Sequence, residues 1–314
     1  MKILITGANG FIGKSLCKAL SKLYSNITGT VRFIQSPSCV DDINYISVGD
    51  ISLNPNWKDA LVDCDYVIHC AARAHITSES NKKSLETYRL INVKSTKILA
   101  EKCVSAGVKR LIFLSSIGVL GVDTNNRKPF IYSDDPNPID NYSISKFEAV
   151  QELFKISKNS GLEIVVIRSP LVYGASPPGN LARLIKFINF GMPLPFRKLT
   201  NKRSMIGIDN LVDLIVKCIL HPDAANKTFL VSDDNDLSTP DLIRLISTSM
   251  RCKSRLFYAP IFLIKFLGYI FRKKKEIYKL IGSLQVDINH TKKVLNWRPP
   301  LSVKEGINRM VQGK

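Results

Sequence analysis

Short apolar runs alternate with longer segments of helical periodicity through the first half of the chain. The runs lie at residues 2–7, 26–31, 44–49, 65–71, 109–116 and 163–169. Several are apolar over four or five consecutive residues, which is typical of strands that are covered on both faces. Between them, apolar residues recur at helical spacing over 11–23, 85–107 and 142–161. The alternation predicts an α/β fold with a Rossmann-type, doubly wound parallel sheet.

The pattern changes after Pro170. The segments 175–181 and 192–196 are rich in proline and glycine, and strand and helix patterns return over 204–232. We therefore predict a first domain over 1–169 and a smaller, mostly helical domain over 170–314. Parts of 204–232 are expected to rejoin the first domain.

Positive charge is concentrated near the C-terminus. The net charge is +19, and the chain from Arg251 onward holds 15 Lys and Arg residues against 3 acids. This indicates either an anionic partner or a solvated basic surface, and the sequence leaves both open. The apolar stretch 257–271 is interrupted by Lys265 and is shorter than the roughly 20 residues of a membrane-spanning helix. We favour a core-packed helix followed by a charged loop; the alternative is an amphipathic segment in peripheral contact with an anionic membrane.

The seven cysteines are scattered and include no C-x-x-C pair. Most lie inside apolar runs, where a thiol packs as a small hydrophobe, so we expect no metal site. Free thiols and an apolar strand that begins at Ile3, with no export signal before it, predict a cytoplasmic protein.

The sequence TGANGFIG follows the first predicted strand and leads directly into a helical pattern. Gly7 permits a tight turn, Gly10 lets the backbone approach a pyrophosphate, and Gly13 allows close packing of helix on strand. The phosphates would lie at the helix N-terminus, beside Phe11 and Ile12. The segment therefore predicts a dinucleotide site, and Asp50 and Ile51, in the loop after the third strand, are candidates to contact the adenine.

Two helical residues and a pair of serines carry the candidate chemistry. Tyr142 and Lys146 are four residues apart, hence on one face of a helix. A nearby ammonium favours the phenolate, which would bring the tyrosine into reach as a proton donor and acceptor near neutral pH. Ser115 and Ser116 end a strand, at the sheet edge where such folds bind ligands.

With these motifs the sequence resembles the extended short-chain dehydrogenase/reductase family, in its nucleotide-sugar epimerase/dehydratase branch. The likeness also includes HCAA at 69–72, INV around Asn92, LSSIGVLG at 114–121, RSPLVYG at 168–174 and RSMIGIDNLVDLI at 203–215. It implies that Tyr142 is the acid/base at a sugar oxygen and that Ser116 bonds the reacting oxygen. Lys146 would hold the nicotinamide ribose and lower the pKa of the tyrosine.

The resemblance also implies further contacts. Ala71, Ala72 and Asn92 would bind the cofactor, whereas Asn180 and Arg203 would grip the diphosphate and nucleoside of a UDP-sugar. The first domain would then bind NAD(P) and the second the nucleotide sugar. No nucleic-acid partner is expected, and the family favours a homodimer joined through the helices at 85–106 and 142–159.

The choice of cofactor depends on the end of the second strand. Similar UDP-galactose 4-epimerases place an aspartate at the position of Val31, where it binds the adenosine ribose of NAD. Here Arg32 follows, and a guanidinium suits the 2′-phosphate of NADP. We therefore favour NADP (NADPH) over NAD. The alternative is that Arg32 stacks on adenine or faces solvent.

Three reactions of the family compete. A 4,6-dehydratase carries a carboxylate pair after the strand-end serine, whereas Ile117 and Gly118 stand here. The cofactor prediction favours a 4-ketoreductase of a UDP-2-acetamido-2,6-dideoxy-4-hexulose in surface-polysaccharide synthesis. The alternative is a UDP-glucose or UDP-N-acetylglucosamine 4-epimerase, and Leu284 would leave room for an N-acetyl group. A steroid-type dehydrogenase and a non-catalytic dinucleotide-sensing protein are the remaining hypotheses.

Overall fold

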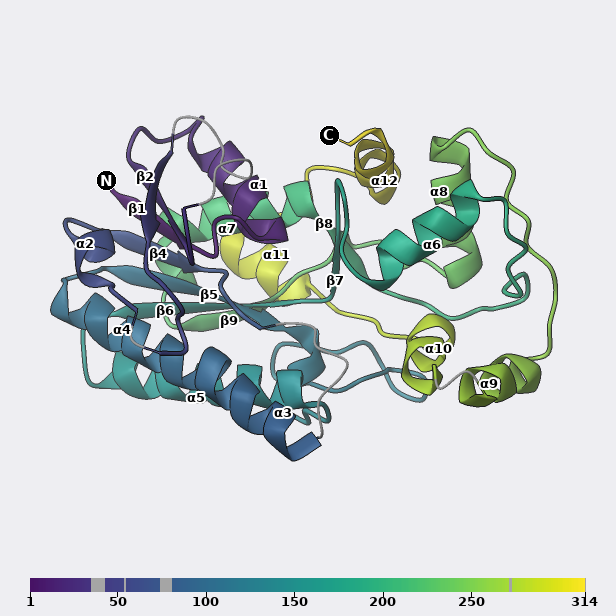
Figure 1. Ribbon diagram of the computed structural model, residues 1–314, viewed down its shortest axis with the longest axis horizontal. Helices are drawn as coiled ribbons and strands as arrows, with labels where there is room; N and C mark the ends of the chain where they lie inside the picture. Colours follow the sequence, from purple (N-terminus) through teal and green to yellow (C-terminus); the bar gives the residue numbers. More distant parts are fainter. Residues whose placement is uncertain (35–42, 54, 74–80, 271–272, 314) are drawn as a thin grey trace.

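A parallel sheet of seven strands forms the centre of the molecule (Figure 1). The computed structural model describes residues 1–34, 43–53, 55–73, 81–270 and 273–313, so Cys39 lies outside it. The strands are β1 (Ile3–Thr6), β2 (Ile27–Val31), β3 (Asn44–Ser47), β4 (Tyr66–His69), β5 (Arg110–Ser116), β6 (Glu163–Ser169) and β9 (Lys227–Leu230). Their spatial order is β3-β2-β1-β4-β5-β6-β9.

Helices cover both faces of the sheet, as Figure 1 shows. One face packs against α1 (Phe11–Leu20), α7 (Ile208–Leu220) and α11 (Asn289–Leu295). The other packs against α2 (Lys58–Leu61), α4 (Ser95–Ser105) and α5 (Asn141–Lys158). Burial on both faces explains why these strands read as continuous apolar runs.

The six predicted strands are present, and the predicted Rossmann-type α/β class is confirmed. The helical pattern over 85–107 is not one uniform helix. It consists of α3 (Asn81–Tyr88), a π-helical segment η2 (Arg89–Lys94) and α4. Short 3₁₀ turns lie at Ile117–Val119 and Pro222–Ala224.

The C-terminal portion is mostly helical and lies beside the carboxyl edge of the sheet (Figure 1). A third apolar cluster joins its helices. Of the segment 204–232, β9 enters the main sheet next to β6, whereas β8 pairs with β7 in a separate sheet of two strands. The elements are β7 (Leu171–Tyr173), α6 (Asn180–Asn189), β8 (Met205–Gly207), α8 (Thr239–Ser249), α9 (Ile261–Ile270), α10 (Lys274–Ile281) and α12 (Val303–Gln312).

The favoured prediction of a core-packed helix over the apolar stretch is wrong. In α9, Ile264 is buried, whereas Phe262, Phe266 and Tyr269 are exposed to 68%, 58% and 73%. The helix is apolar on nearly every side, and one side alone meets the rest of the molecule. Periodicity could not reveal this, because a uniformly apolar helix carries no polar face to mark the side turned to solvent.

The C-terminal tail is tied to α7 by polar contacts. The indole of Trp297 donates to Asp213 at 2.7 Å. The side chain of Asn210 donates to the carbonyl of Leu301 at 2.8 Å and accepts from its amide at 2.9 Å. These bonds fix the last helix against the Rossmann portion of the molecule.

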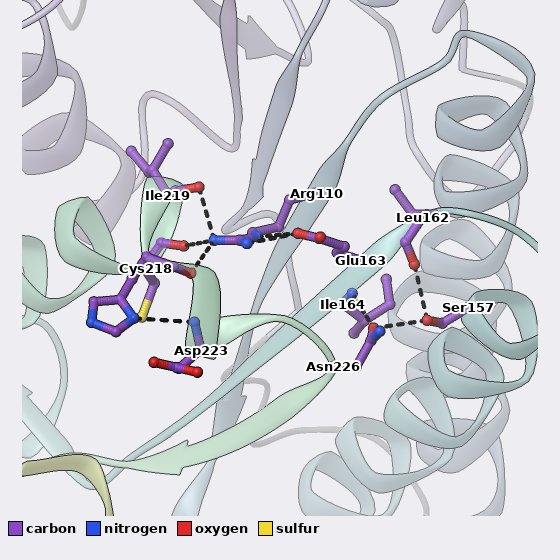
Figure 2. A network of polar contacts seen from close by, with 10 residues as sticks. Arg110, Ser157, Leu162, Glu163, Ile164, Cys218, Ile219, Asp223 and Asn226 are labelled. Carbon is purple, nitrogen blue, oxygen red and sulfur yellow. Dashed lines mark hydrogen bonds and ion pairs between the residues drawn. The ribbon is translucent and has the colours of Figure 1, made fainter. Parts of the chain in front are cut away.

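Arg110 joins the amino end of β5 to the end of α7 (Figure 2). Its guanidinium donates to the carbonyls of Cys218, Ile219 and His221 at 2.6, 2.9 and 2.9 Å. These acceptors include carbonyls that the last turn of a helix leaves unpaired. Glu163 of β6 holds the other side of the guanidinium at 2.6 Å. The buried arginine therefore acts as a side-chain cap for α7.

Replacing Arg110 by methionine is expected to destabilise the protein. The variant leaves three carbonyls at the end of α7 without their donor, and each unsatisfied acceptor costs on the order of 1 kcal/mol, so the unfolding free energy should fall by about 3 kcal/mol. Urea denaturation measures this cost. Arg244→Met is the matched control, because Arg244 and its partner Asp241 are both exposed and its removal should leave the midpoint unchanged. Equal midpoints for both variants would contradict the capping role.

Candidate active site

The strand order reverses between β1 and β4, and the candidate residues gather at the carboxyl edge of the sheet on either side of this point. From β1 the chain runs outward to β2 and β3, and from β4 it runs the other way to β5, β6 and β9. Open parallel sheets bind ligands in the crevice at such a reversal.

The glycine turn after β1 leaves no space for side chains. Gly7 has a left-handed φ of +65°, and a Cβ there would lie 2.9 Å from the backbone of Ala71. A Cβ on Gly13 would lie 2.1 Å from the carbonyl oxygen of Gly7. The turn is closed by a hydrogen bond of 2.9 Å from the Gly10 amide to that same carbonyl. Glycine is therefore required at both Gly7 and Gly13.

This cradle suits a dinucleotide pyrophosphate. Helix α1 starts at Phe11 with no side-chain cap and no acidic residue in its first turn. Its amide groups and the positive end of its dipole are thus directed at the predicted phosphate position. Ile12 follows Phe11 in the first turn of α1, and Ala72 follows Ala71 in the loop after β4. The side chains of these four residues are partly buried.

Arg32 and Asp50 form an ion pair at the edge of this region. Their charged groups are 3.4 Å apart, with the arginine side chain 57% exposed. Hydrogen bonds from the hydroxyl and amide of Ser52, at 2.7 and 2.9 Å, and the charge of Arg32 hold the pKa of Asp50 below its usual range. Ile51 is partly buried against the core. The guanidinium already has a carboxylate beside it, which the sequence pattern did not reveal.

The start of α5 is packed against the end of β5. Asp140 caps the helix by accepting from the amide of Ser143 at 2.8 Å. Ser116 ends β5, and its hydroxyl accepts from the amide of Gly118 at 3.1 Å. A Cβ on Gly118 would lie 2.3 Å from the hydroxyl of Ser143. This close contact brings Ser116 to the first turn of α5, where Tyr142 lies.

Lys146 lies one turn further along α5 and is 2% exposed. Its ammonium is 4.1 Å from the centre of the Phe113 ring on β5. Burial lowers the pKa of Lys146 to about 7. The lysine therefore lies under the candidate tyrosine, on the sheet side of the helix, and the Cys70 thiol offsets part of the lowering of its pKa.

The predicted lowering of the tyrosine pKa is wrong for the protein alone. Burial raises the pKa of Tyr142, and the charges of Asp140 and Tyr88 act in the same direction. The rings of Tyr142 and Tyr88 meet edge to face with centroids 6.3 Å apart. Desolvation disfavours the phenolate, and it also disfavours the charged form of Lys146 that would stabilise that phenolate.

Asn92 links helix α5 to the loop after β4. Its amide oxygen accepts from the Arg73 amide at 2.9 Å, and its amide nitrogen donates to the Arg73 carbonyl at 3.2 Å. The nitrogen also donates to the hydroxyl of Ser145 at 2.9 Å, and this hydroxyl donates to the Tyr142 carbonyl at 2.7 Å. Asn92 thus positions the backbone around both loop and helix; direct contact with a cofactor stays a prediction.

A buried histidine extends this network and was not singled out from the sequence. His69 bonds Thr6 at 2.6 Å through Nδ1 and Thr96 at 3.0 Å through Nε2. Thr96 donates to the Asn92 carbonyl at 2.7 Å. Burial, followed by the charge of Lys146, lowers the pKa of His69 to about 3, so the ring is neutral. The signals available in the sequence were its place in the HCAA motif and at the carboxyl end of β4.

The predicted nucleotide residues lie on the C-terminal side of the crevice. Asn180 is the exposed first residue of α6. Arg203 is partly buried and donates to the Gly282 carbonyl at 3.1 Å, and burial lowers its pKa. Leu284 is buried beside it, where its carbonyl accepts from the Ser204 amide at 2.8 Å. Arg203 and Leu284 are thus neighbours, whereas Asn180 belongs to a separate element.

A glycine cradle and a Tyr/Lys pair on this fold define a dinucleotide-dependent enzyme of the short-chain dehydrogenase/reductase type. The sequence matches the NAD dependent epimerase/dehydratase family over residues 3–232. The chain belongs to that family.

Relatives with assigned names are similar over nearly the whole chain. A UDP-glucose 4-epimerase of Vibrio cholerae is 41% identical over 312 residues, covering 99% of this chain and 94% of that protein. An N-acetyl-α-D-glucosaminyl-diphospho-ditrans,octacis-undecaprenol 4-epimerase of Escherichia coli O157:H7 is 25% identical, covering 86% and 78%. A UDP-glucuronic acid 4-epimerase from Bacillus cereus, solved with UDP-glucuronic acid and NAD, has a TM-score of 0.80 at 23% identity, covering 100% and 98%.

The buried lysine makes the stability dependent on pH. Its pKa is about 7 in the folded protein and 10.5 in an exposed lysine, so between these values the unfolded chain binds the extra proton. The unfolding free energy of the wild type should therefore rise with pH, by about 1 kcal/mol per unit from pH 7 to 10, relative to Lys146→Met. Urea denaturation of both proteins across this range gives the difference. A difference that does not change with pH would show that Lys146 keeps its ordinary pKa.

Proposed function

We propose that the protein is an NAD-dependent 4-epimerase of a UDP-hexose. The observation that carries the proposal is the arrangement of Tyr142, Lys146 and Ser116 around the carboxyl edge of β5, beside the glycine cradle. The similarity to a UDP-glucose 4-epimerase at 41% identity supports the same substrate class. Cytoplasmic location and a homodimer remain predictions that go with this proposal.

The chain's own groups have defined tasks in such a reaction. When bound, NAD supplies the acceptor and donor of the C4 hydride. Tyr142 takes the proton of the C4 hydroxyl and later returns it, while Ser116 holds the same oxygen. Lys146 would hold the nicotinamide ribose and, when charged, would favour the phenolate that burial otherwise disfavours. Asn180 and Arg203 would hold the nucleotide, which would keep the oxidised sugar in the site while it rotates to present its other face.

The residues that follow Ser116 do not suit a 4,6-dehydratase reaction. A 4,6-dehydratase needs further acid and base groups after the strand-end serine, but Ile117 is buried and Gly118 lies against Ser143. A carboxylate side chain at 118 would occupy the space that the Ser143 hydroxyl fills. These contacts support a reaction at C4 over a 4,6-dehydration.

A second candidate, the NADPH-dependent 4-ketoreductase, is favoured by Val31 and Arg32 at the ribose end of the site. Against it, the Asp50 carboxylate beside Arg32 is ionised and would repel a 2′-phosphate. This pairing and the epimerase names of the relatives support the epimerase over the ketoreductase.

Incubation with UDP-glucose and with UDP-N-acetylglucosamine should give the C4 epimer of at least one, without added cofactor and without its net consumption. Product analysis by NMR and absorbance at the reduced-nicotinamide band measure both quantities. If the 6-deoxy-4-keto derivative of UDP-N-acetylglucosamine instead consumes NADPH stoichiometrically while neither hexose is inverted, the ketoreductase replaces the epimerase.

Tyr142→Phe should lower kcat by about 10²- to 10⁴-fold, because the proton carrier is lost. Tyr88→Phe is the matched control, since it keeps the neighbouring ring and should change kcat little.

The cofactor assignment predicts a weak effect of Arg32. If NAD is the cofactor, Arg32→Ser should leave the Kd for NAD within about threefold, because the ion pair with Asp50 is exposed and contributes little. Isothermal titration with NAD and with NADP measures the preference. Tighter binding of NADP than NAD by the wild type, lost about tenfold or more in Arg32→Ser, would assign the arginine to the 2′-phosphate.

A further inference from the structure

An exposed apolar surface on α9 is used neither by the sheet nor by the candidate site. We call it the α9 surface, and its members are Ile261, Phe262, Phe266, Tyr269 and Ile270, each at least 49% exposed. Scattered apolar residues are common on protein surfaces, whereas five large ones on one ten-residue helix are not. A contiguous patch of this kind marks an interaction site.

The helix is held in a fixed orientation on the opposite side. Ile264 is buried in the apolar cluster of the C-terminal portion. Gly268, one turn later, meets α10 so closely that a Cβ there would lie 2.7 Å from the side chain of Ile277. The buried stripe through Ile264 and Gly268 therefore turns Phe262, Phe266 and Tyr269 away from the body of the protein. Figure 1 shows α9 at the periphery, far from the sheet.

The chain around this surface is strongly basic. Residues 251–282 contain nine Lys and Arg residues and a single acid, Glu276. Lys265 on α9 and Lys279 on α10 are exposed. Lys198, from a separate loop, places its ammonium 4.7 Å from the centre of the Tyr258 ring, just before α9. Aromatic and aliphatic groups are thus surrounded by cations, so the matching partner is apolar within and anionic at its surface.

A second copy of this chain fits these features poorly. A symmetric contact places the same patch on both partners, so two strongly basic segments would face each other across an apolar seam. A bilayer-spanning role is also unsuitable, since within the described ranges no helix is long and apolar enough to cross a membrane. A helix that lies in the headgroup layer does not have to span the bilayer, and it does not bring two basic surfaces together. Its apolar side chains enter the acyl boundary and its lysines meet lipid phosphates.

We propose that the α9 surface docks the protein on the surface of an anionic phospholipid bilayer. The apolar side chains of α9 lie in the membrane interface, and Lys265 and Lys279 contact the headgroups. The proposal does not depend on the proposed reaction, because binding is independent of turnover.

Sedimentation with vesicles tests this directly. At low salt, the full-length protein should pellet with vesicles of phosphatidylcholine and phosphatidylglycerol in equal parts. It should stay in the supernatant at high salt, and also with vesicles of phosphatidylcholine alone. Phe262→Ser/Phe266→Ser should weaken partitioning at least about tenfold, because two aromatic rings no longer enter the interface. Lys265→Gln/Lys279→Gln should weaken it by roughly tenfold as well.

The control is a matched pair on the far side of the molecule. Lys22 and Leu23, in the turn after α1, are both exposed, and Lys22→Gln/Leu23→Ser should partition as the wild type does. Wild-type protein that stays in the supernatant, or a Phe262→Ser/Phe266→Ser variant that still pellets fully, overturns the proposal. So does a phenylalanine variant whose mass by analytical ultracentrifugation falls below that of the wild type, since a second copy would then cover the surface. If Phe262→Ser/Phe266→Ser fails to fold, the partitioning of Lys265→Gln/Lys279→Gln and the salt dependence of wild-type binding still test the proposal.

Discussion

The placement of the candidate site depends on the side-chain amide of Asn92. It is buried, and it bonds both backbone groups of Arg73 in the loop after β4 and the hydroxyl of Ser145 in α5. The loop lies beside the glycine turn, and the helix carries Tyr142 and Lys146. One amide therefore sets the distance between the predicted cofactor cradle and the predicted proton carrier. Thr96 bonds both the backbone carbonyl of Asn92 and the ring of His69, and burial together with the charge of Lys146 lowers the pKa of that imidazole.

The sheet could be predicted from sequence because its strands obey a strong local rule. Runs such as those ending at Thr6 and Ser116 are buried on both faces, so they are apolar without interruption and end together at one edge. The glycine turn was predictable for a related reason. Gly7 and Gly13 are fixed by contacts within one strand-turn-helix unit, which a local pattern can record.

Other features depend on groups that are distant in sequence. The pair of Arg32 and Asp50, and the direction of the Tyr142 pKa, follow from which groups the fold brings together and how far it removes them from water. The exposure of α9 is a similar case. Its sequence is apolar on all sides, and only the contacts of Ile264 and Gly268 determine which side is covered. The spacing of residues along a helix shows which side chains are neighbours, but it does not show how far each side chain is removed from water.

The π-helical segment Arg89–Lys94 has a consequence for how this chain can be altered. A π-helix accommodates one residue more than the α-helix it interrupts, and such segments are often found at functional sites. The wider turn absorbs this extra residue, so α3 and α4 keep nearly the phase that a continuous α-helix one residue shorter would give them. Deleting a single residue there would therefore restore the tighter helix and leave Tyr88 on the side of Tyr142. In a chimera or loop exchange, this segment is thus the place where the chain can lose one residue without changing the angle between the two helices.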